Sequence, residues 1–570
     1  MRSCVVILAS LILLVVAPAA WPVSVEVNKS GNDSVPGGPY KTIQAAIDYC
    51  QSADDGLDVV TITDSGLYEE NFVIGNEDKN IVPVELTSGK TGDARPVISP
   101  LVALGPFVET HRSPADRMAG AAIHSNGSKL SNVILESNPD AEGQRGNGSS
   151  ALHLEANDVI IENVLIRPRA RTQGETNYPN SGIFLSQEGE GGVPVPNGRM
   201  CNNVVIRNCD FVGVATDGQT EPTAQSPNGF LQNPVNGKLA TFARCDAFTD
   251  SEDMVINVTF DNCTFRYSYD AGLFPSNRGR AGVGQINWHV KDCFFDGFGK
   301  FSVRSRGCNL LVERSIFSRA CQGHHGDGEN SAVAMQTQDA NVPNAEVVNC
   351  LFVNCGGVYG QKGYYGGVHS YSGGAMKVNH CTFDLCANGV TVTSGKETYV
   401  SNCIFNRIGY NQVPAIWYDG LPPETADPFV TWDSPNFNPN ITAVFNNYSN
   451  SAVLLQINNC IVNGIADEDT TPWEEFVDVT GCRLAAGAVE GLDTVIRTDH
   501  LSVPMFANRD INAADPYDLS DVSPAIDKAV SAEPAPGSID LDGTPRVIGP
   551  RADLGCQEFR GSAVHEWCLF

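Results

Sequence analysis

A short motif recurs along this chain of 570 residues: a run of β-branched or aliphatic residues, followed by Asn, Cys, any residue and Phe. Close copies occupy residues 208–211, 262–265, 292–295, 349–352, 380–383 and 402–405, and partial copies lie at 163–164 and 459–460. Cys263 and Cys293 are 30 residues apart, Cys350 and Cys381 are 31 apart, and Cys381 and Cys403 are 22 apart. Repeats of this length indicate a solenoid in which each copy forms one coil of short strands.

Each copy is predicted to form two strands that meet at a bend on the Asn. Asn tolerates the left-handed backbone that such a bend needs, and its amide can bond to the Asn of the neighbouring coil. Cys and Phe stand two residues apart on the second strand, so both side chains point into the solenoid. A protein of this kind is therefore expected to have a core of stacked cysteines and phenylalanines.

This pattern resembles the right-handed parallel β-helix of the pectate-lyase-like superfamily, with its asparagine ladder and inward stacks. The resemblance covers roughly residues 120–465. It implies an all-β solenoid with an N-terminal capping helix and a C-terminal cap, and a polysaccharide bound along one outer sheet. The end of the chain is similar to the C-terminal module of bacterial secreted β-helix repeat proteins.

The chain divides into four predicted segments. Residues 1–19 have the form of a secretory signal peptide, with a basic start, an apolar run and Ala-Pro-Ala at 17–19. Residues 20–120 hold an amphipathic helix near 42–50 and the first coils, 121–465 form the β-helix with long loops, and 466–570 form a linker and the capping module. The apolar run is too short to span a bilayer, so we expect a secreted, extracellular or cell-surface monomer without membrane insertion.

The excess of acidic residues limits the classes of molecule that this protein is expected to bind. There are 37 Lys and Arg against 66 Asp and Glu, which gives a net charge of −29. This balance argues against nucleic acid as a partner, and an acidic polysaccharide would need a local basic groove or bound cations. The sequence identifies no cofactor with certainty, and Ca²⁺ is the candidate that an acidic surface would suit. The run Asp540-x-Asp542-Gly543 has the start of a Ca²⁺ loop, yet we interpret it as part of a cap because it offers too few ligands.

Eighteen cysteines in an exported chain would ordinarily indicate a disulfide framework. Those in the repeat share one inward register, and that geometry suits disulfides poorly, so we expect them to be buried free thiols. They are Cys209, Cys263, Cys293, Cys350, Cys381, Cys403 and Cys460, with Cys355 and Cys386 in a second stack. Cysteines outside the register are better disulfide candidates: Cys201, Cys245, Cys308, Cys482, Cys556 and Cys568.

One strand of each coil alternates apolar and polar residues. Since its aliphatic residues face inward, the others are predicted to face outward along one sheet. These are His124, His153, Glu155, Phe184, Arg304, Gln336, His369, Tyr371, Trp417 and Asp419. Gln336, His369, Tyr371, Trp417 and Phe184 are the predicted substrate-binding residues. Loops predicted at 168–181, 213–254, 275–287, 318–331, 356–366 and 420–452 would form a cleft over this face.

The densest polar cluster lies just before the strand that carries Gln336. It contains His324, His325, Asp327 and Glu329, separated by glycines, and it suits acid–base work or a metal, or is a polar turn without a role. In lyases of this superfamily an Arg or Lys commonly takes the proton next to a uronate carboxylate. That resemblance implies Arg304 or Arg278 as base and His324 or His325 as acid; a hydrolase would instead use Asp327 and Glu329 with other carboxylates.

Two function classes remain open on the sequence. One is a secreted polysaccharide-active enzyme, lyase-like before hydrolase-like, acting on an extracellular glycan, for which a uronate-containing polymer is one candidate. The other is a non-catalytic carbohydrate-binding or cell-surface structural β-helix protein, which would use the aromatic residues of the same face to stack on sugars.

Overall fold

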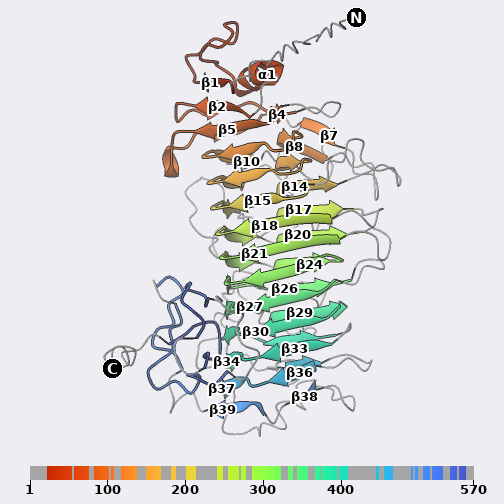
Figure 1. Cartoon of the computed structure of the whole chain (residues 1–570), viewed down its shortest axis with the longest axis vertical. Coiled ribbons are helices and arrows are strands. Elements are labelled where there is room, and N and C mark those ends of the chain that lie inside the picture. Colours follow the sequence, from red (N-terminus) through yellow and green to blue (C-terminus); the bar gives the residue numbers. More distant parts are fainter. Residues whose placement is uncertain are drawn as a thin grey trace, which may run out of the picture.

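The strands form three long parallel sheets, which we call A, B and C. In the part of the chain that the structure describes they contain 14, 13 and 12 strands. The computed structural model describes residues 22–559 apart from 54–56, 76–81, 102–103, 108–116, 138–148, 169–180, 188–200, 214–240, 248–254, 269–270, 278–284, 299, 322–330, 338–342, 357–365, 373, 394–396, 409–444, 448–454, 466–488, 492–493, 499–504, 514–515, 530–538 and 548–550. Figure 1 shows the strands of these sheets following one another along the long axis of the molecule.

Successive coils add one strand to each sheet. Sheet A contains, in order, β1 (Ser24–Val27), β2 (Asp58–Ile62), β5 (Val84–Ser88), β9 (Lys129–Ser131), β12 (Ile160–Glu162), β15 (Val204–Arg207), β18 (Val255–Asp261), β21 (Gln285–Lys291), β24 (Asn309–Glu313), β27 (Ala345–Val348), β30 (Met376–Asn379), β33 (Thr398–Ser401), β36 (Leu455–Asn458) and β38 (Val489–Glu490). Sheet B contains β3 (Leu67–Tyr68), β6 (Val97–Ile98), β10 (Ile134–Ser137), β13 (Leu165–Pro168), β16 (Asp210–Val212), β19 (Thr264–Ser268), β22 (Phe294–Phe298), β25 (Ile316–Ser318), β28 (Leu351–Val353), β31 (Thr382–Asp384), β34 (Ile404–Ile408), β37 (Ile461–Ile465) and β39 (Ile496–Thr498). Sheet C contains β4 (Phe72–Ile74), β8 (Arg117–Ile123), β11 (Ser149–Leu154), β14 (Ser181–Gln187), β17 (Thr241–Ala247), β20 (Ala271–Asn277), β23 (Phe301–Arg306), β26 (Ser331–Gln336), β29 (Gly366–Ser372), β32 (Val390–Val392) and β35 (Phe445–Asn447), with β7 (Leu104–Phe107) antiparallel to β8. This is the predicted parallel β-helix.

The bend between sheets A and B lies on the repeated Asn. At Asn132, Asn163, Asn208, Asn262, Asn349, Asn402 and Asn459 the φ angle is positive, between 51° and 58°. The amide of Asn262 donates to Asn208 Oδ1 at 2.8 Å, and that of Asn459 donates to Asn402 Oδ1 at 3.3 Å. Both predicted properties of the Asn, the left-handed backbone and the bond between coils, are confirmed at these positions.

The interior is built from the two predicted stacks. Phe211, Phe265, Phe295, Phe317, Phe352, Phe383 and Phe405 stack with ring centroids 4.6–4.9 Å apart. The cysteines of the repeat are buried and reduced. Their thiols donate to backbone carbonyls, as from Cys263 Sγ to Ile206 O at 3.4 Å. The coil spacing of about 4.8 Å thus brings identical side chains into contact along the axis.

Three expectations from the sequence need correction. Cys201, Cys245, Cys308 and Cys556 are buried thiols, not disulfide partners, and Cys482 and Cys568 lie outside the described residues. One coil was missed because Arg314 and Ser315 replace Asn and Cys at its bend. The interval 213–254, interpreted as a loop, contains β17, whose core residues Phe242, Ala243 and Cys245 do not alternate simply along the strand.

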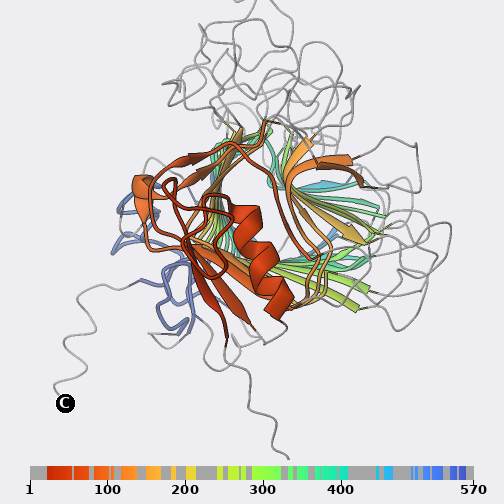
Figure 2. The same cartoon turned by 90° about the horizontal axis from the view of Figure 1, so that it is seen from above.

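The helix α1 (Ile43–Ala53) lies across the N-terminal end of the solenoid (Figure 2). Its face of Ile43, Ala46, Ile47 and Cys50 is fully buried in the main core, as the sequence indicated. At its first turn the Glu70 carboxylate accepts a hydrogen bond from the Ile43 backbone N–H at 3.0 Å. That this helix protects the first coil from association remains a prediction. Within the described residues, no helix combines the length and apolar character needed to cross a membrane.

The C-terminal segment, described at residues 505–529 and 539–559 with small gaps, runs alongside the last coils (Figure 1). It packs on the outer face of sheet B, where Leu351, Val353, Ile404 and Ile461 form apolar clusters with its own residues. The sequence predicted a closing cap; the described residues lie on the flank, because these strands carry apolar side chains on both faces. The Asp540 carboxylate accepts hydrogen bonds from the backbone N–H groups of residues 542, 544 and 558, and so orders the backbone of this segment.

Candidate functional site

The outer face of sheet C carries a column of side chains that runs from β11 to β32. The inward column of this sheet is aliphatic, with Leu152, Ile183, Leu273, Val303, Val333 and Val368 aligned in the core. The residue that follows each inward position points outward. We call this second column the outer ladder: His153, Phe184, Arg244, Phe274, Arg304, Ala334, His369 and Thr391.

Three arginines surround one phenylalanine in the middle of the outer ladder. The guanidinium carbons of Arg244, Arg304 and Arg306 lie 5.5, 5.5 and 5.3 Å from the centroid of the Phe274 ring. Arg304 also lies 4.7 Å from the centroid of Phe301. A guanidinium over an aromatic face is attracted by the ring quadrupole, typically by about 0.5–1 kcal/mol or more. We call these five residues the basic-aromatic cluster.

Gln336 fixes two of these arginines. Its Oε1 accepts hydrogen bonds from Arg304 Nη2 and Arg306 Nε, both at 2.9 Å. The two arginines stand two residues apart on β23, so both point outward, and Gln336 lies beside Arg306 on β26. The structure thus brings together Arg304 and Gln336, which the sequence had placed on one face.

The other predicted binding residues lie elsewhere on the same sheet. His369 is two coils beyond Arg304 in the outer ladder, fully buried, with Nε2 3.0 Å from Thr393 Oγ1. Tyr371 meets its ring edge-on at 5.8 Å and is the extra residue of a β-bulge, a feature that often re-aims side chains at functional sites. Phe184, also buried, stacks on His153 at 6.0 Å.

The remaining predicted residues lie outside the described part of the chain. They are Arg278, His324, His325, Asp327, Glu329, Trp417 and Asp419. Residues 322–330 connect Cys321 to β26, the strand that carries Gln336. Beyond β32, the next described strand of sheet C is β35, not the strand expected at 416–419. The assigned roles of these residues remain predictions.

Sequence reasoning missed most of the basic-aromatic cluster. Arg306 stands two positions after Arg304, so the period of a strand would have placed it on the same face. Phe274 follows the inward Leu273 and carried the same signal. Arg244 was hidden because its strand had been interpreted as part of a long loop.

Two hollows lie away from sheet C. One, of about 680 Å³, lies on the outer face of sheet A over Asn257, Asn287 and Asn309. Their amides bond from coil to coil at 2.9–3.1 Å, so these groups hold the solenoid together. The other, of about 610 Å³, lies between sheet B and the C-terminal segment and is lined by Arg266, Arg319 and Arg509. Arg319 is paired there with Asp296 and Arg509 with Asp384, which favours a structural role.

No family model matches the sequence, and no curated protein matches it. Among solved structures it is similar to pectate lyase Pel9A, with 11% identity over 95% of this chain and 98% of that chain and a TM-score of 0.33. It is also similar to a mannuronic-acid-specific family 6 polysaccharide lyase from the human gut microbiota, at 9% identity, 80% and 90% coverage and a TM-score of 0.37. A lacto-N-biosidase from Eubacterium ramulus matches at 10% identity, 69% and 65% coverage and a TM-score of 0.35. The class defined here is a parallel β-helix protein, and its function has to be argued from its own residues.

Proposed function

We propose that the outer face of sheet C binds an extracellular polysaccharide that contains uronate. The observation that carries this proposal is the basic-aromatic cluster, in which three arginines gather on one face of a protein whose net charge is −29. A guanidinium presents a planar set of donors that matches a carboxylate. The cluster is thus the kind of local basic surface that an acidic glycan needs on such a chain.

The shape of the site suits a polymer. The described outer ladder crosses successive coils about 4.8 Å apart, so it offers an extended row of contacts rather than one small pocket. Tyr371, half-buried two coils from Arg304, supplies an aromatic side chain against which a sugar ring packs. Arg304 and Arg306, held by Gln336, are assigned to the carboxylates of the glycan.

For chemistry we propose elimination in preference to hydrolysis. In this reaction a base removes the proton beside the carboxylate, a carbon–carbon double bond forms, and the glycosidic oxygen leaves with a proton from an acid. Arg304 or Arg278 is the proposed base and His324 or His325 the proposed acid. The contacts of Arg304 with Phe301 and Phe274 stabilise its charged form, which suits a role in neutralising the uronate carboxylate. To act as the base, Arg304 must first lose this charge.

The test combines a panel of glycans with matched variants. Wild-type protein is incubated with uronate-containing and neutral glycans, and absorbance of unsaturated products, reducing ends and binding are followed. We expect Arg304→Ala and Arg306→Ala to weaken binding of the acidic glycan about tenfold or more each, as loss of a charge-assisted contact does. Arg314→Ala is the control, because Arg314 is paired with Asp292 at the bend between sheets A and B.

The outcomes separate the alternatives. Binding without unsaturated products or new reducing ends would leave a non-catalytic carbohydrate-binding protein. New reducing ends without unsaturated products would indicate a hydrolase. Unchanged glycan binding in Arg304→Ala, Arg306→Ala and Gln336→Ala, with the fold intact by circular dichroism, would show that the binding site does not lie on sheet C. Export is part of the proposal, and N-terminal sequencing of protein from the culture medium should find a start near Ala20.

A further inference from the structure

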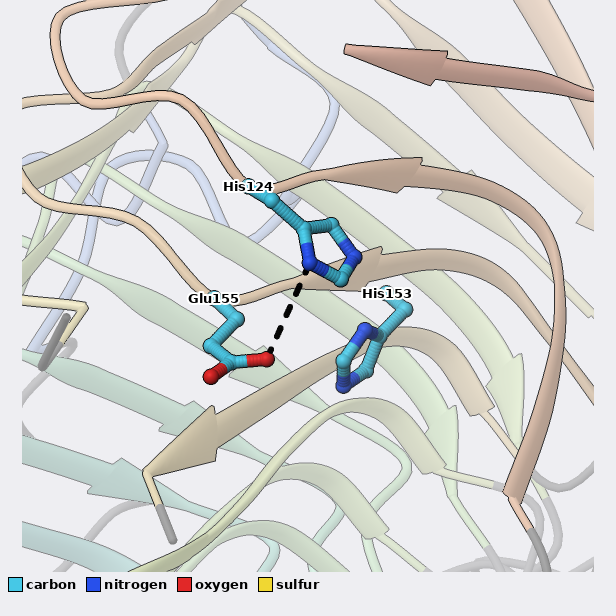
Figure 3. A group of neighbouring side chains, drawn as sticks. All are labelled: His124, His153 and Glu155. Carbon is cyan, nitrogen blue, oxygen red and sulfur yellow. Dashed lines mark ion pairs between the residues drawn. The ribbon is translucent and has the colours of Figure 1, made fainter. Parts of the chain in front are cut away.

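Two histidines and a glutamate meet on the outer face of sheet C near its N-terminal end. His124 follows β8, and His153 and Glu155 lie at the end of β11 (Figure 3). One ligand atom from each residue can be chosen so that all three lie within 4.8 Å of one another. His124 Nδ1 is 3.8 Å from Glu155 Oε2, and the two imidazole centroids are 5.5 Å apart.

The three side chains lie together because of the register between adjacent coils. Ile123 pairs with Leu154, so His124 and Glu155 occupy the same outward position of adjacent coils, while His153 stands opposite Ala122. In the preceding coil the residue that aligns with His124 is Gly75. Its φ is +90°, and a Cβ added there would lie 2.8 Å from the Ser125 backbone N. Gly75 and Ala122 thus leave space beside the imidazoles on the side of the preceding coils, while Phe184 stacks on His153 from the following coil.

We propose that His124, His153 and Glu155 bind a divalent transition-metal ion of the Zn²⁺ class, through one nitrogen of each imidazole and the carboxylate. A tetrahedral ion with bonds of about 2.0–2.1 Å holds its ligand atoms about 3.3 Å apart. The separation of 3.8 Å between His124 and Glu155 reaches this value with a small rotation of the Glu155 side chain.

Burial and donor type both support an ion of this class. The residues His124 and His153 are 3% and 2% exposed, whereas the side chain of Glu155 is 20% exposed. Two imidazoles and one carboxylate suit Zn²⁺, Co²⁺ or Ni²⁺, whereas Ca²⁺ prefers six to eight oxygen ligands. Each imidazole uses one nitrogen for the metal, and the second is then available for the hydrogen bond that commonly orients a metal-binding histidine.

The proposed site is distinct from the basic-aromatic cluster. His153 and Arg304 belong to the same outer ladder but are separated by four steps, from β11 through β14, β17 and β20 to β23. At about 4.8 Å a step this is about 19 Å. Three protein ligands leave at least one coordination position open, as in zinc sites that bind water or a substrate.

The experiment uses the full-length protein after treatment with a chelator and needs no glycan. Isothermal titration with ZnCl₂ should give one tight site per chain, and CoCl₂ should produce the visible absorption of tetrahedral Co²⁺. His153→Ala should weaken Zn²⁺ binding by about 100-fold or more, and Glu155→Gln, which keeps the size of the side chain, by about tenfold or more. Thermal unfolding without metal checks that each variant is folded.

His289→Ala is the matched control. His289 pairs with Glu313 at 2.9 Å on sheet A, is partly exposed, and belongs to no three-ligand group in the described residues. Its loss should leave Zn²⁺ affinity unchanged. The proposal is overturned if the chelated wild-type protein binds none of Zn²⁺, Co²⁺ and Ni²⁺ stoichiometrically. It is also overturned if the affinity of folded Glu155→Gln and His153→Ala equals that of wild type.

Discussion

Cysteine serves inside this solenoid as a small apolar residue that also donates a weak hydrogen bond. Cys350 is fully buried, and its thiol donates to Val348 O at 3.2 Å. The coil that contains Ser315 at the same position shows a hydroxyl making the equivalent bond, to Glu313 O at 2.9 Å. Burial raises the pKa of the Cys350 thiol well above its ordinary value, so Cys350 is protonated and unreactive in the folded protein.

The effect of a Cys350 substitution on stability should therefore depend on the size of the new side chain and on whether it keeps the hydrogen bond. Cys350→Ala removes the sulfur and leaves a small cavity, which should lower the free energy of unfolding by about 1–2 kcal/mol. Cys350→Ser should cost less than Cys350→Asp, which buries an unpaired charge and should prevent stable folding. Urea unfolding measures the first two. Titration of thiols in denatured, unreduced wild type should find most of the cysteines free; finding almost none would contradict the buried-thiol ladder.

At the scale of elements, we predict that α1 caps the end at which the parallel sheets would otherwise present open edges. An exposed edge pairs readily with another chain. Ile47→Asp places a charge in the fully buried face of the helix and should detach it, at a cost of several kcal/mol. We expect the variant to form oligomers in size-exclusion chromatography with light scattering. Ser52→Asp adds the same charge on the exposed side of the helix and should stay monomeric; equal behaviour of both variants would refute the capping role.

The C-terminal segment should attach to sheet B in a pH-dependent manner. Burial raises the pKa of Glu558 from 4.5 to about 8, although nearby Arg546 acts in the opposite direction. A carboxyl whose pKa is higher in the folded state stabilises that state fully below pH 4.5, and this contribution is lost as pH rises through about 8. Attachment should therefore weaken from pH 5 to pH 8.

Limited proteolysis across the same pH range tests whether the attachment weakens as the pH rises. Glu558→Gln retains an oxygen that accepts the Asp553 backbone N–H, now at 2.9 Å from Glu558 Oε1, but cannot ionise. Cleavage within residues 505–559, divided by the cleavage of Glu558→Gln at the same pH, should increase toward pH 8. A ratio that is constant with pH would show that Glu558 does not control the attachment.

At the scale of the whole molecule, the sequence predicted the solenoid because each coil places the same structural requirement on its residues. Every coil needs a left-handed bend and an inward pair, so Asn262, Cys263 and Phe265 have counterparts throughout the chain. The coil of Ser315 was missed because a hydroxyl can satisfy the same position by bonding to the backbone. A sequence pattern therefore identifies the coils that carry the common Asn and Cys more readily than the coil that carries Arg314 and Ser315 in their place.

The candidate sites were less predictable because they depend on the register between coils. The outward positions of Arg304, Gln336 and His153 follow from alternation within one strand. That Arg244 and Arg306 share the ring of Phe274, or that Glu155 lies beside His124, follows only from which residues align across coils 30 or more positions apart. Loops of unequal length between the strands conceal that alignment in the sequence.

The net charge of −29 should oppose the approach of an acidic glycan even though the basic-aromatic cluster attracts it at contact. The screening length falls from about 30 Å at 0.01 M salt to about 10 Å at 0.1 M, so salt removes long-range repulsion before it weakens contacts of a few ångströms. The association rate of a uronate oligosaccharide, measured by stopped flow, should therefore rise over this range, while that of a neutral oligosaccharide stays constant. Arg304→Ala should act mainly by raising the dissociation rate. An association rate that falls steeply with salt in wild type would mean that the arginines dominate the field at long range, contrary to this account.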